Sequence, residues 1–441
     1  MPDARLASLT FLEKCRRADA WSDAVLGSVM DSHGLDGRDR GLCTAICYGV
    51  MQNRILLDHA VAAYSSVKPH KLEPTVLDIL RITACQLLFM DRIPASAAVN
   101  EAVKLSKKLG YARASGLVNA VSRKIGANKA ELLAPKGKTV AETLSLRYSH
   151  PSELVEYFIS LLGEEETEAL LRCHNADVPT FLQVNTVKTT REALLQRFAE
   201  AGVPAEPHEH LPGTIVLRSA GAVSALPGFA EGEFYVQDCA AFMAIMAAQP
   251  KAGERVLDVC SAPGGKSFAA HVLSGGKIDI ISCDLHENKL KRIRESAERL
   301  GLDSLRTLAA DGREFRAEFE EAFDLVIADV PCSGLGVIRK KPDIRYKNTA
   351  DFEALPQIQL DILKNVSRYV RPGGRLLYST CTVREEENKS LVEAFLADNA
   401  DYEAEGFSLP GMGEVSGGML QLWPQHHGTD GFFIAKLRRR K

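Results

Sequence analysis

Apolar residues recur at helical spacing along the first part of the chain. Leu42, Ile46 and Val50 lie on one helical face, and further faces of the same period follow. Because each apolar face needs a partner to be buried, the pattern predicts a helical bundle over residues 4–126. The following stretch, residues 127–140, is rich in Lys and Ala with one Pro and one Gly. That composition is typical of a linker.

The pattern changes beyond the linker. Two amphipathic helices are expected at Ser152–Leu162 and Glu164–Cys173. Strand-like runs at Phe181–Asn185 and Thr214–Leu217 flank a helical segment, Arg191–Ala201. Mixed short strands and a helix predict a small α+β (RRM-like) subdomain ahead of the main sheet.

From Glu254 onward, short apolar strands alternate with longer helices. The expected strands are Arg255–Val259, Ile278–Cys283, Leu305–Ala309, Leu325–Ala328, Arg375–Tyr378 and, antiparallel at or near an edge, Gly431–Leu437. This alternation predicts an α/β Rossmann-like domain, a mostly parallel sheet with helices on both faces. We therefore expect a multidomain chain: an all-α bundle in 1–140, a helical linker and α+β subdomain in 141–240, and the α/β domain in 241–441.

Composition fits a globular protein of several domains. The chain has 441 residues, of which 46% are hydrophobic and 25% charged. No window approaches the ~18 apolar residues of a membrane span, and no amino-terminal segment resembles a signal peptide, so we expect a cytoplasmic protein. Ten cysteines are scattered without a C-x-x-C pair. The sequence therefore gives no support for a zinc site, and we expect no metal.

Charge is divided unevenly along the chain. Residues 1–140 hold 20 Lys and Arg against 13 Asp and Glu, a balance of +7, which leaves −10 for residues 141–441. A basic half suggests contact with a polyanion. The alternative is an ordinary solvated surface spread over several helices.

A glycine turn follows the first strand of the α/β domain. Gly264 and Gly265 allow close backbone approach to a ligand, and the helix start behind them offers free N–H groups to a carboxylate. The segment matches neither the G-x-G-x-x-G dinucleotide fingerprint nor a P-loop. A nicotinamide dehydrogenase is therefore the weaker interpretation of this turn.

Acidic residues stand at the ends of the next three strands. Asp284 lies where an acid can hydrogen-bond ribose hydroxyls, and Asp311 and Asp329 end the third and fourth strands. Carboxylates would repel phosphates, so the set fits a nucleoside ligand without a polyphosphate. S-adenosyl-L-methionine, with its cationic sulfonium, has that profile.

Two cysteines also occupy strand ends. Cys332 follows the fourth strand and Cys381 the fifth. Position alone does not separate a packed thiol from a nucleophile, because free cysteine also behaves as a small hydrophobe.

Three segments together resemble a known family. They are Cys260 to Lys266, Asp329 to Val337 with its Pro-Cys-Ser-Gly core, and Tyr378 to Thr382 followed by Glu387-Asn388. These segments resemble the three signature motifs of the RNA cytosine-C5 methyltransferases. The stretches Ala97–Val103 and Val118–Val121 resemble a NusB-type RNA-binding domain. The combination, with the ending His427 to Phe433, is similar to the RsmB (Fmu/Sun) subfamily, which acts on small-subunit ribosomal RNA.

The resemblance implies roles for individual residues. It implies that Cys381 is the nucleophile that adds to cytosine C6, that Cys332 assists release, and that Asp329 contacts the N3 edge. It implies S-adenosyl-L-methionine bound by Asp284 at the ribose, Asp311 on the adenine side, Asp329, and the turn residues Cys260, Ser261, Ala262, Pro263, Gly264, Gly265 and Lys266. The implied partner is 16S ribosomal RNA or a small-subunit assembly intermediate, and we expect the chain to act as a monomer.

Several residues keep a second interpretation. Cys260 fits core packing, Lys266 fits solvent exposure or a salt bridge to Asp258, and the pair Glu387-Asn388 fits a helix cap. The loop Arg339–Lys347, rich in cations and with one Tyr, suits RNA phosphates and base stacking or is simply an exposed loop.

The sequence also departs from the family pattern in places. Ser261 and Val330 stand where alanine is usual, and Gln183 where arginine is usual. Rival functions are the same chemistry on transfer RNA or DNA, and a non-catalytic NusB-like RNA-binding or antitermination factor.

Overall fold

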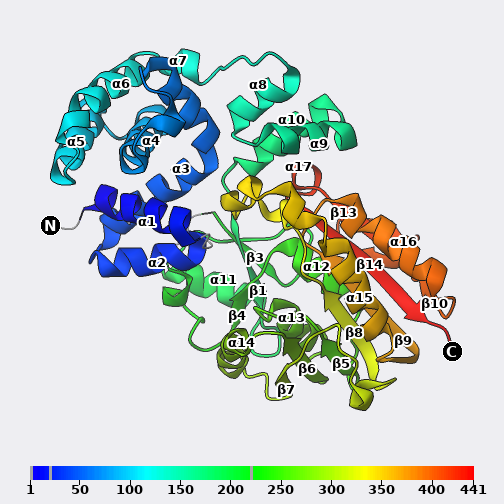
Figure 1. The fold of residues 1–441 in the computed structure, drawn as a ribbon. Helices are drawn as coiled ribbons and strands as arrows, with labels where there is room; N and C mark the ends of the chain where they lie inside the picture. Colours follow the sequence, from blue (N-terminus) through cyan, green and yellow to red (C-terminus); the bar gives the residue numbers. More distant parts are fainter. Residues whose placement is uncertain (1–2, 19–21, 219–221) are drawn as a thin grey trace. The chain divides into compact units, whose positions relative to one another are not determined.

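The computed structural model describes residues 3–18, 22–218 and 222–441 (Figure 1). The chain forms two compact units, one of Met1–Ala176 with Lys340–Lys347, the other of Asp177–Arg339 with Asn348–Lys441. In the described part of the chain, no helix is both long and apolar enough to cross a lipid bilayer. The bundle pattern of residues 4–126 also covers 19–21, which lie outside the described residues.

The first unit is entirely helical. Its helices are α1 (Ala4–Ala18), α2 (Ser22–Ser32), α3 (Gly37–Tyr64), α4 (Pro74–Phe89), α5 (Ala95–Lys108), α6 (Ser115–Ala127), α7 (Lys129–Leu132), α8 (Val140–Tyr148), α9 (Ser152–Leu162) and α10 (Glu164–His174). Helix α4 is buried along almost its whole length and packs against α1, α3, α5 and α6. Its start is fixed by Pro74 and by the Glu73 carboxylate, which accepts the N–H groups of Thr75 and Val76. The expected bundle is therefore confirmed.

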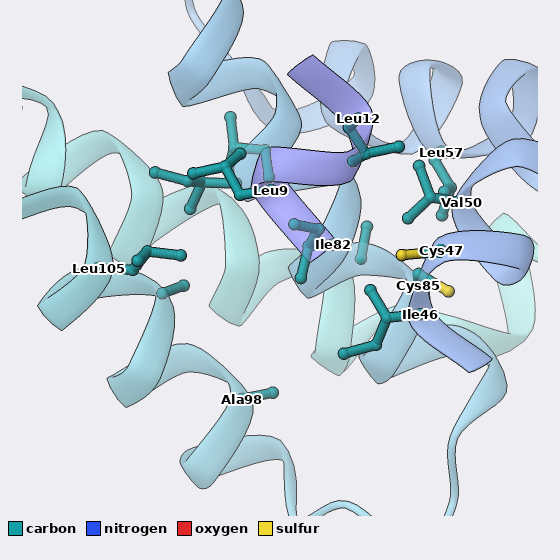
Figure 2. Packing of buried hydrophobic residues seen from close by; sticks show 14 of the residues in the cluster. Leu9, Leu12, Ile46, Cys47, Val50, Leu57, Ile82, Cys85, Ala98 and Leu105 are labelled. Atoms are coloured by element: carbon teal, nitrogen blue, oxygen red, sulfur yellow. The ribbon is translucent and has the colours of Figure 1, made fainter. Parts of the chain in front are cut away.

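The bundle core is made of small and branched apolar side chains. Leu9 and Leu12 of α1, Ile46, Cys47, Val50 and Leu57 of α3, and Ile82 and Cys85 of α4 converge in Figure 2. Full burial of one such Leu or Ile contributes about 1.5–3 kcal/mol to folding.

The linker expected at residues 127–140 is shorter in the structure. Helix α7 occupies Lys129–Leu132, because Leu132 is buried in the bundle core and its neighbours are good helix formers. Only residues 133–139 separate α7 from α8.

The second unit begins with a small sheet. Its strands β1 (Thr180–Val184), β2 (Glu206–Pro207), β3 (Thr214–Leu217) and β4 (Phe234–Val236) pair antiparallel in the order β2-β3-β1-β4, beside α11 (Arg191–Glu200). The two central strands and the helix match the expected α+β subdomain. The edge strands β2 and β4 were not predicted, because they are too short to show a period.

The main sheet carries the candidate chemistry. Its strands are β5 (Arg255–Asp258), β6 (Asp279–Asp284), β7 (Leu305–Ala309), β8 (Phe323–Asp329), β9 (Val370–Thr380), β10 (Tyr402–Ala404), β13 (Met419–Leu422) and β14 (Phe432–Arg439). The order is β10-β14-β9-β8-β5-β6-β7, with β13 also on β14. Strands β5 to β9 are parallel, and β14 is antiparallel to β9. The predicted Rossmann-like sheet is confirmed, with its last long strand near one edge.

Helices cover both faces of this sheet (Figure 1). Helices α12 (Cys239–Ala248), α13 (Gly265–Leu273) and α14 (Glu287–Leu300) bury one apolar cluster, and α15 (Leu355–Ser367) and α16 (Lys389–Asp398) bury another. Strand residues alternate between the two clusters, as period-2 geometry requires. The carboxyl ends of β5, β6, β8 and β9 are thereby held along one edge.

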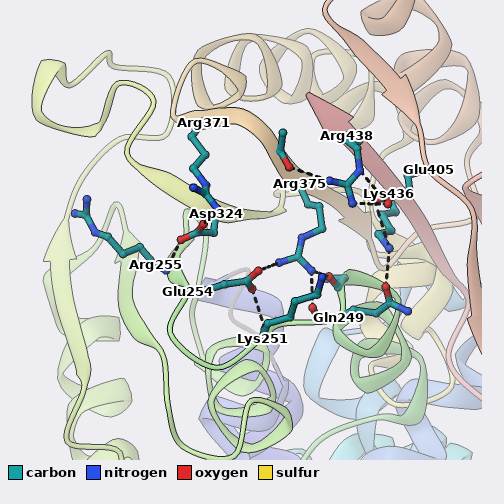
Figure 3. A network of polar contacts seen from close by, with 12 residues as sticks. Gln249, Lys251, Glu254, Arg255, Asp324, Arg371, Arg375, Glu405, Lys436 and Arg438 are labelled. Atoms are coloured by element: carbon teal, nitrogen blue, oxygen red, sulfur yellow. Dashed lines mark hydrogen bonds and ion pairs between the residues drawn. The ribbon is translucent and has the colours of Figure 1, made fainter. Parts of the chain in front are cut away.

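Buried charges tie the opposite edge of the sheet together (Figure 3). Arg375 donates to the carbonyls of Ala248 and Gln249, at 2.8 and 2.5 Å, and pairs with Glu254. Lys436 donates to the Gln249 side chain at 3.0 Å. Because buried charges are tolerated only when paired, this network ties β9 and β14 to the carboxyl end of α12.

Candidate active site

The glycine turn is braced on the neighbouring strand. Ser261 donates its backbone N–H and its hydroxyl to the Cys283 carbonyl, at 2.7 and 2.8 Å. Gly264 has φ +105°, and a Cβ there would lie 2.4 Å from the Phe268 ring. Only glycine fits at this point, so α13 begins with its first N–H groups next to the turn. The Ser261 hydroxyl, an extra group where alanine is usual, serves the brace.

The other turn residues are either packed in the interior or exposed at the surface. Cys260 packs against the apolar cluster under α15, and burial raises the pKa of its thiol. Ala262 is half-buried and Pro263 exposed. A Cβ on Gly265 would lie 3.1 Å from the Gln237 amide nitrogen. None of these four residues brings a charged side chain to the turn.

Asp284 and Asp311 follow adjacent strands. The Asp284 carboxylate accepts the His286 N–H at 3.0 Å and lies 3.4 Å from Lys289 Nζ. Asp311 is gripped by Arg313, whose Nη2 donates at 2.6 Å, and this hydrogen bond lowers the pKa of Asp311. Both carboxylates stand where the sequence places them, at the ends of β6 and β7.

Two exposed apolar side chains flank these acids and were not predicted. Leu285, next to Asp284, is 57% exposed, and Phe315 is 40% exposed. Phe315 also lines a cavity of about 230 Å³ beside Asp311. Large apolar residues in water next to strand-end acids offer a surface for a flat ring. The sequence signal was Leu285 itself, an apolar residue directly after the strand-end acid.

Asp329 receives two donors. Lys266 Nζ lies 2.6 Å from Oδ2, and the Ser379 hydroxyl donates to Oδ1 at 2.8 Å. Lys266 Nζ also lies 5.0 Å from the centre of the Phe432 ring. Lys266 is buried, so the alternative of solvent exposure is wrong, and its carboxylate partner is Asp329 rather than Asp258. The ammonium of the glycine turn is thus brought to the end of β8.

The two strand-end cysteines lie together. Cys332 Sγ is 3.4 Å from Cys381 Sγ, although 49 residues separate them in sequence. The register of β8 on β9 pairs Asp329 with Ser379, which sets both thiols beside that carboxylate. The Cys381 contact, followed by burial, raises the pKa of Cys332 well above its usual value. The proton therefore stays on Cys332, whose S–H can donate to the Cys381 sulfur.

A close backbone crossing locks the segment after Cys332. The Gly336 N–H donates to the Cys381 carbonyl at 3.0 Å, and the Gly431 N–H donates to the Gly336 carbonyl at 2.9 Å. A Cβ on Gly336 would lie 1.8 Å from the Gly431 oxygen. Glycine is required here so that the Cys332 segment can reach the end of β9.

Glu387 and Asn388 do not cap the next helix. Asn388 is the N-cap of α16, but its side chain accepts no helix N–H, and Glu387 lies in the preceding short 3-10 helix, Glu385–Glu387. Both are buried and bond to the segments that carry the two cysteines. The capping interpretation is therefore wrong.

The loop Arg339–Lys347 is not a free basic loop. Arg339 is buried and pairs with Asp430 and Asp238 at 2.7 and 3.2 Å. Arg345 is 1% exposed. The guanidinium of Arg54 lies 3.7 Å above the Tyr346 ring. The expectation that these side chains meet phosphates and bases is wrong for Arg339, Arg345 and Tyr346.

Arg345 instead hydrogen-bonds to backbone groups at a kink in helix α3. Asn53 has non-helical torsion angles inside α3. The Gln52 carbonyl accepts from Arg345 at 3.0 Å, and the Leu56 N–H donates to the Ser149 hydroxyl at 2.9 Å. Arg345 also donates to the Tyr148 carbonyl at 3.2 Å. Groups freed by the kink are thus satisfied by side chains from distant segments.

Gln183 and Asp258 are also interior groups. The Gln183 amide donates to the Gln237 carbonyl at 3.0 Å and accepts from the Thr214 hydroxyl at 2.7 Å, which leaves no role at a phosphate. Asp258 accepts from Ser267 at 2.6 Å, and burial raises its pKa to about 7.

A polar groove lies between α5 and α6 in the first unit. Its volume is about 490 Å³, and it is lined by Asn100, Val103, Lys104, Ser115, Gly116 and Asn119. Lys104 has 73% of its side chain exposed, and Lys107, Lys108 and Arg113 nearby are also exposed. The groove thus combines amide groups with one exposed cation, Lys104, and further exposed cations follow it on α5 and before α6.

Family models match three successive parts of the chain. The family model described as 16S rRNA methyltransferase RsmB/F matches residues 245–438, the NusB family model residues 2–126, and the RsmF/B-like ferredoxin-like domain residues 150–224. The chain is 36% identical to the "Probable ribosomal RNA small subunit methyltransferase B" of Bacillus subtilis, with 98% of each chain covered. It is 35% identical to "Ribosomal RNA small subunit methyltransferase B" of Pseudomonas putida, again with 98% of each covered.

A solved structure has the same architecture throughout. The crystal structure of PH0851 superposes with a TM-score of 0.83 at 27% identity, covering 100% of this chain and 99% of that one. The relatives and the solved structure thus match this chain over nearly its whole length, from the helical unit to the main sheet. The chain belongs to the RsmB/F family of 16S rRNA methyltransferases, with a NusB-type domain and a ferredoxin-like domain ahead of its methyltransferase domain.

Proposed function

We propose that this protein methylates C5 of a cytosine in 16S ribosomal RNA, through a covalent bond between Cys381 and C6 of the base. The observation that carries the proposal is the 3.4 Å contact between Cys332 and Cys381 beside the Asp329–Lys266 pair. One thiol to add and a second to help release match a reaction in which an enzyme bond must form and then break.

The methyl donor is S-adenosyl-L-methionine, and the residues at the turn fit it. Gly264 allows close approach, and the first N–H groups of α13 suit a carboxylate. Asp284 suits ribose hydroxyls, and Leu285 offers an apolar surface to adenine. When bound, this cofactor supplies an electrophilic methyl group.

Cys381 opens the reaction by bonding its sulfur to C6, after its proton has passed to solvent. Negative charge then develops on the ring, and C5 becomes nucleophilic enough to take the methyl group. Asp329 accepts from the exocyclic amine of the base, and Lys266 donates to N3. The contact of the Lys266 ammonium with Asp329 supports this role for Lys266.

Cys332 completes the reaction by taking the proton on C5. While Cys381 is free, its contact is the largest cause of the raised pKa of Cys332. Once the Cys381 sulfur is bonded to C6, that contact is lost, and Cys332 can release its own proton to solvent. It then accepts the C5 proton as the Cys381–C6 bond breaks, which restores the aromatic ring. The expelled Cys381 thiolate takes back one proton from solvent, so the net products are 5-methylcytosine, the demethylated cofactor and one proton.

The target base must leave its stack, because both faces of the ring are needed. The groove of Asn100 and Asn119, with the cations around Lys104, supports RNA binding by the first unit. Phosphate contacts there would position the RNA without reading its sequence.

The test is methyl transfer from labelled S-adenosyl-L-methionine to purified 16S rRNA, read by bisulfite sequencing. We expect label at a small number of cytosines with the native protein and none with Cys381→Ala. Preferential labelling of a transfer RNA pool would contradict the ribosomal substrate. Tight RNA binding without transfer would contradict the enzymatic proposal.

A further inference from the structure

Glu387 and Asn388, adjacent in sequence, hold the segments of the two cysteines separately. The Glu387 carboxylate accepts the Ser333 N–H at 2.9 Å and the Gln359 amide at 2.8 Å. The same Gln359 amide donates to the Pro331 carbonyl at 2.9 Å. Pro331 and Ser333 are the two neighbours of Cys332, so Glu387 and Gln359 fix that cysteine from both sides.

Asn388 likewise hydrogen-bonds to the residues on both sides of Cys381. Its side-chain oxygen accepts the Thr380 hydroxyl at 2.5 Å, and its amide donates to the Thr382 carbonyl at 3.1 Å. Thr380 and Thr382 are the two neighbours of Cys381. One further bond, between the hydroxyls of Ser333 and Thr382 at 2.7 Å, joins the two supports.

We propose that Glu387 and Asn388 are positioning residues, which set the separation of the two thiols and act on different steps of the proposed reaction. Glu387 serves release by Cys332, and Asn388 serves addition by Cys381. The inference rests on the proposed function, because it assigns each residue to a step of that reaction.

The energetics of Glu387 argue for more than folding. Its side chain is fully buried, one carboxylate oxygen has no hydrogen-bond partner, and the Arg384 guanidinium is 3.7 Å away. A buried carboxylate with so little compensation is costly, and apolar side chains of similar volume are often neutral or stabilising at such positions. The geometry it imposes on Cys332 is the benefit that the structure shows.

Single substitutions separate the two roles. In Glu387→Ala the Cys332 segment loses its anchor while Cys381 keeps its own. We expect the covalent protein–RNA adduct to form and to accumulate about tenfold or more above the native level on a denaturing gel. Asn388→Ala should instead slow adduct formation by on the order of 10²-fold, the scale of a misplaced reacting group, without accumulation.

Three further variants make the result decisive. Glu387→Gln keeps an oxygen that accepts both donors, so adduct levels should return towards native. Asn185→Ala removes a buried amide that donates to the carbonyls of Gly232 and Leu300, at 3.0 and 2.9 Å. This control should lower stability and leave the ratio of adduct to product unchanged. Cys332→Ala is the reference for a blocked release step.

The outcomes distinguish this inference from the proposed function. If Cys332→Ala traps no adduct, the covalent mechanism itself fails. If Cys332→Ala traps adduct but Glu387→Ala and Asn388→Ala lose activity in the same way, without a difference in adduct, the positioning roles are overturned. Failure of Glu387→Gln to restore release would equally overturn a role based on geometry.

Discussion

The protein contains two close pairs of thiols, one in each unit, and they differ in everything but proximity. Cys43 and Cys47 lie 3.9 Å apart on consecutive turns of α3. Cys332 and Cys381 lie 3.4 Å apart on the ends of two parallel strands. The first pair is fully buried in the bundle core, whereas both members of the second are half-buried.

The surroundings of each pair explain the difference. Among the described residues, the Ser8 hydroxyl donates to the Cys43 sulfur at 3.5 Å, and burial raises the pKa of Cys47. Near Cys332 and Cys381 stand an ammonium and a carboxylate, Lys266 and Asp329. Proximity of thiols therefore has no chemical meaning without access and without groups that stabilise charge.

Loss of Cys381 should have the largest effect. We expect Cys381→Ala to lower methyl transfer by roughly 10⁴-fold or more, the scale on which covalent enzymes lose rate without their nucleophile. No adduct should form. Measurement is by incorporation of labelled methyl groups into 16S rRNA, and residual transfer near the native rate would show that the two pairs are not functionally different.

Lys266 should come next. Lys266→Met removes the donor next to Asp329 while keeping an unbranched side chain. We expect a loss of about 10²–10³-fold in kcat, the usual range for one donor to a developing charge. Lys436→Met, which removes a buried ammonium at the opposite edge of the sheet, is the control. Equal losses in kcat from both variants would place the effect in folding instead.

Asp258 should make stability depend on pH. Its pKa is raised from 3.8 to about 7 by burial, so the folded state holds this proton more tightly than the unfolded chain. Its contribution to the free energy of unfolding is fully present below about pH 4 and is lost as the pH rises through about 7. The total change is roughly 4 kcal/mol. Urea unfolding from pH 4 to 8 should show this fall in the native protein.

The control for that measurement is a matched pair of variants. Asp258→Asn should flatten the pH dependence, because no proton is left to release. Asp279→Asn, which changes an exposed carboxylate paired with Arg306, should leave it intact. An unchanged slope in Asp258→Asn would assign the effect to another group.

The reactivity of Cys332 should report on its neighbour. In Cys381→Ala the largest cause of its raised pKa is removed, so alkylation of Cys332 by iodoacetamide should begin at lower pH than in the native protein. Peptide mass spectrometry identifies the modified thiol. Cys47 should stay unmodified in both proteins as long as they are folded, and a pH profile of Cys332 that does not move would argue against the coupling of the two site thiols.

The smallest effect on activity should come from the buried pair. Cys47→Ala leaves a small cavity in the bundle, with an expected loss of about 1–2 kcal/mol in the free energy of unfolding. The rate of methyl transfer at a temperature where both proteins are folded should be unchanged. A specific loss of activity there would give the first pair a role that its surroundings do not suggest.

Periodicity predicted most of the fold because the two larger sheets bury apolar faces. The central strands β5 to β8 lie within two residues of their expected ends, since each is an apolar run bounded by turn residues. The fifth strand, expected at Arg375–Tyr378, instead spans Val370–Thr380 and includes the Pro-Gly-Gly sequence before Arg375. The pairing of β9 with β8 shifts register at this point, which accommodates the extra residues of β9, and Gly373 has φ +76°.

The site was predicted where motif and strand end coincide, as at Cys381, Cys332 and the glycine turn. Contacts between distant segments were not predicted. Glu387 meets Ser333 across 54 positions, and Arg345 meets Tyr148 across 197. Local sequence shows only that Glu387 is acidic before a helix and that Arg345 is basic in a loop, so a cap and an RNA contact were the natural expectations.

The buried Arg345 also has a consequence for how such a chain could be rearranged. The segment Lys340–Lys347 belongs to the helical unit, although it is encoded between the motif of Cys332 and that of Cys381. A recombination event that exchanged only the first 176 residues would keep Arg345 but replace the residues shaped around its guanidinium, including Asn175, whose side-chain oxygen accepts from it at 2.9 Å. An inherited domain swap must therefore alter two separated stretches of the gene at once, which ties the histories of the helical unit and the methyltransferase domain together.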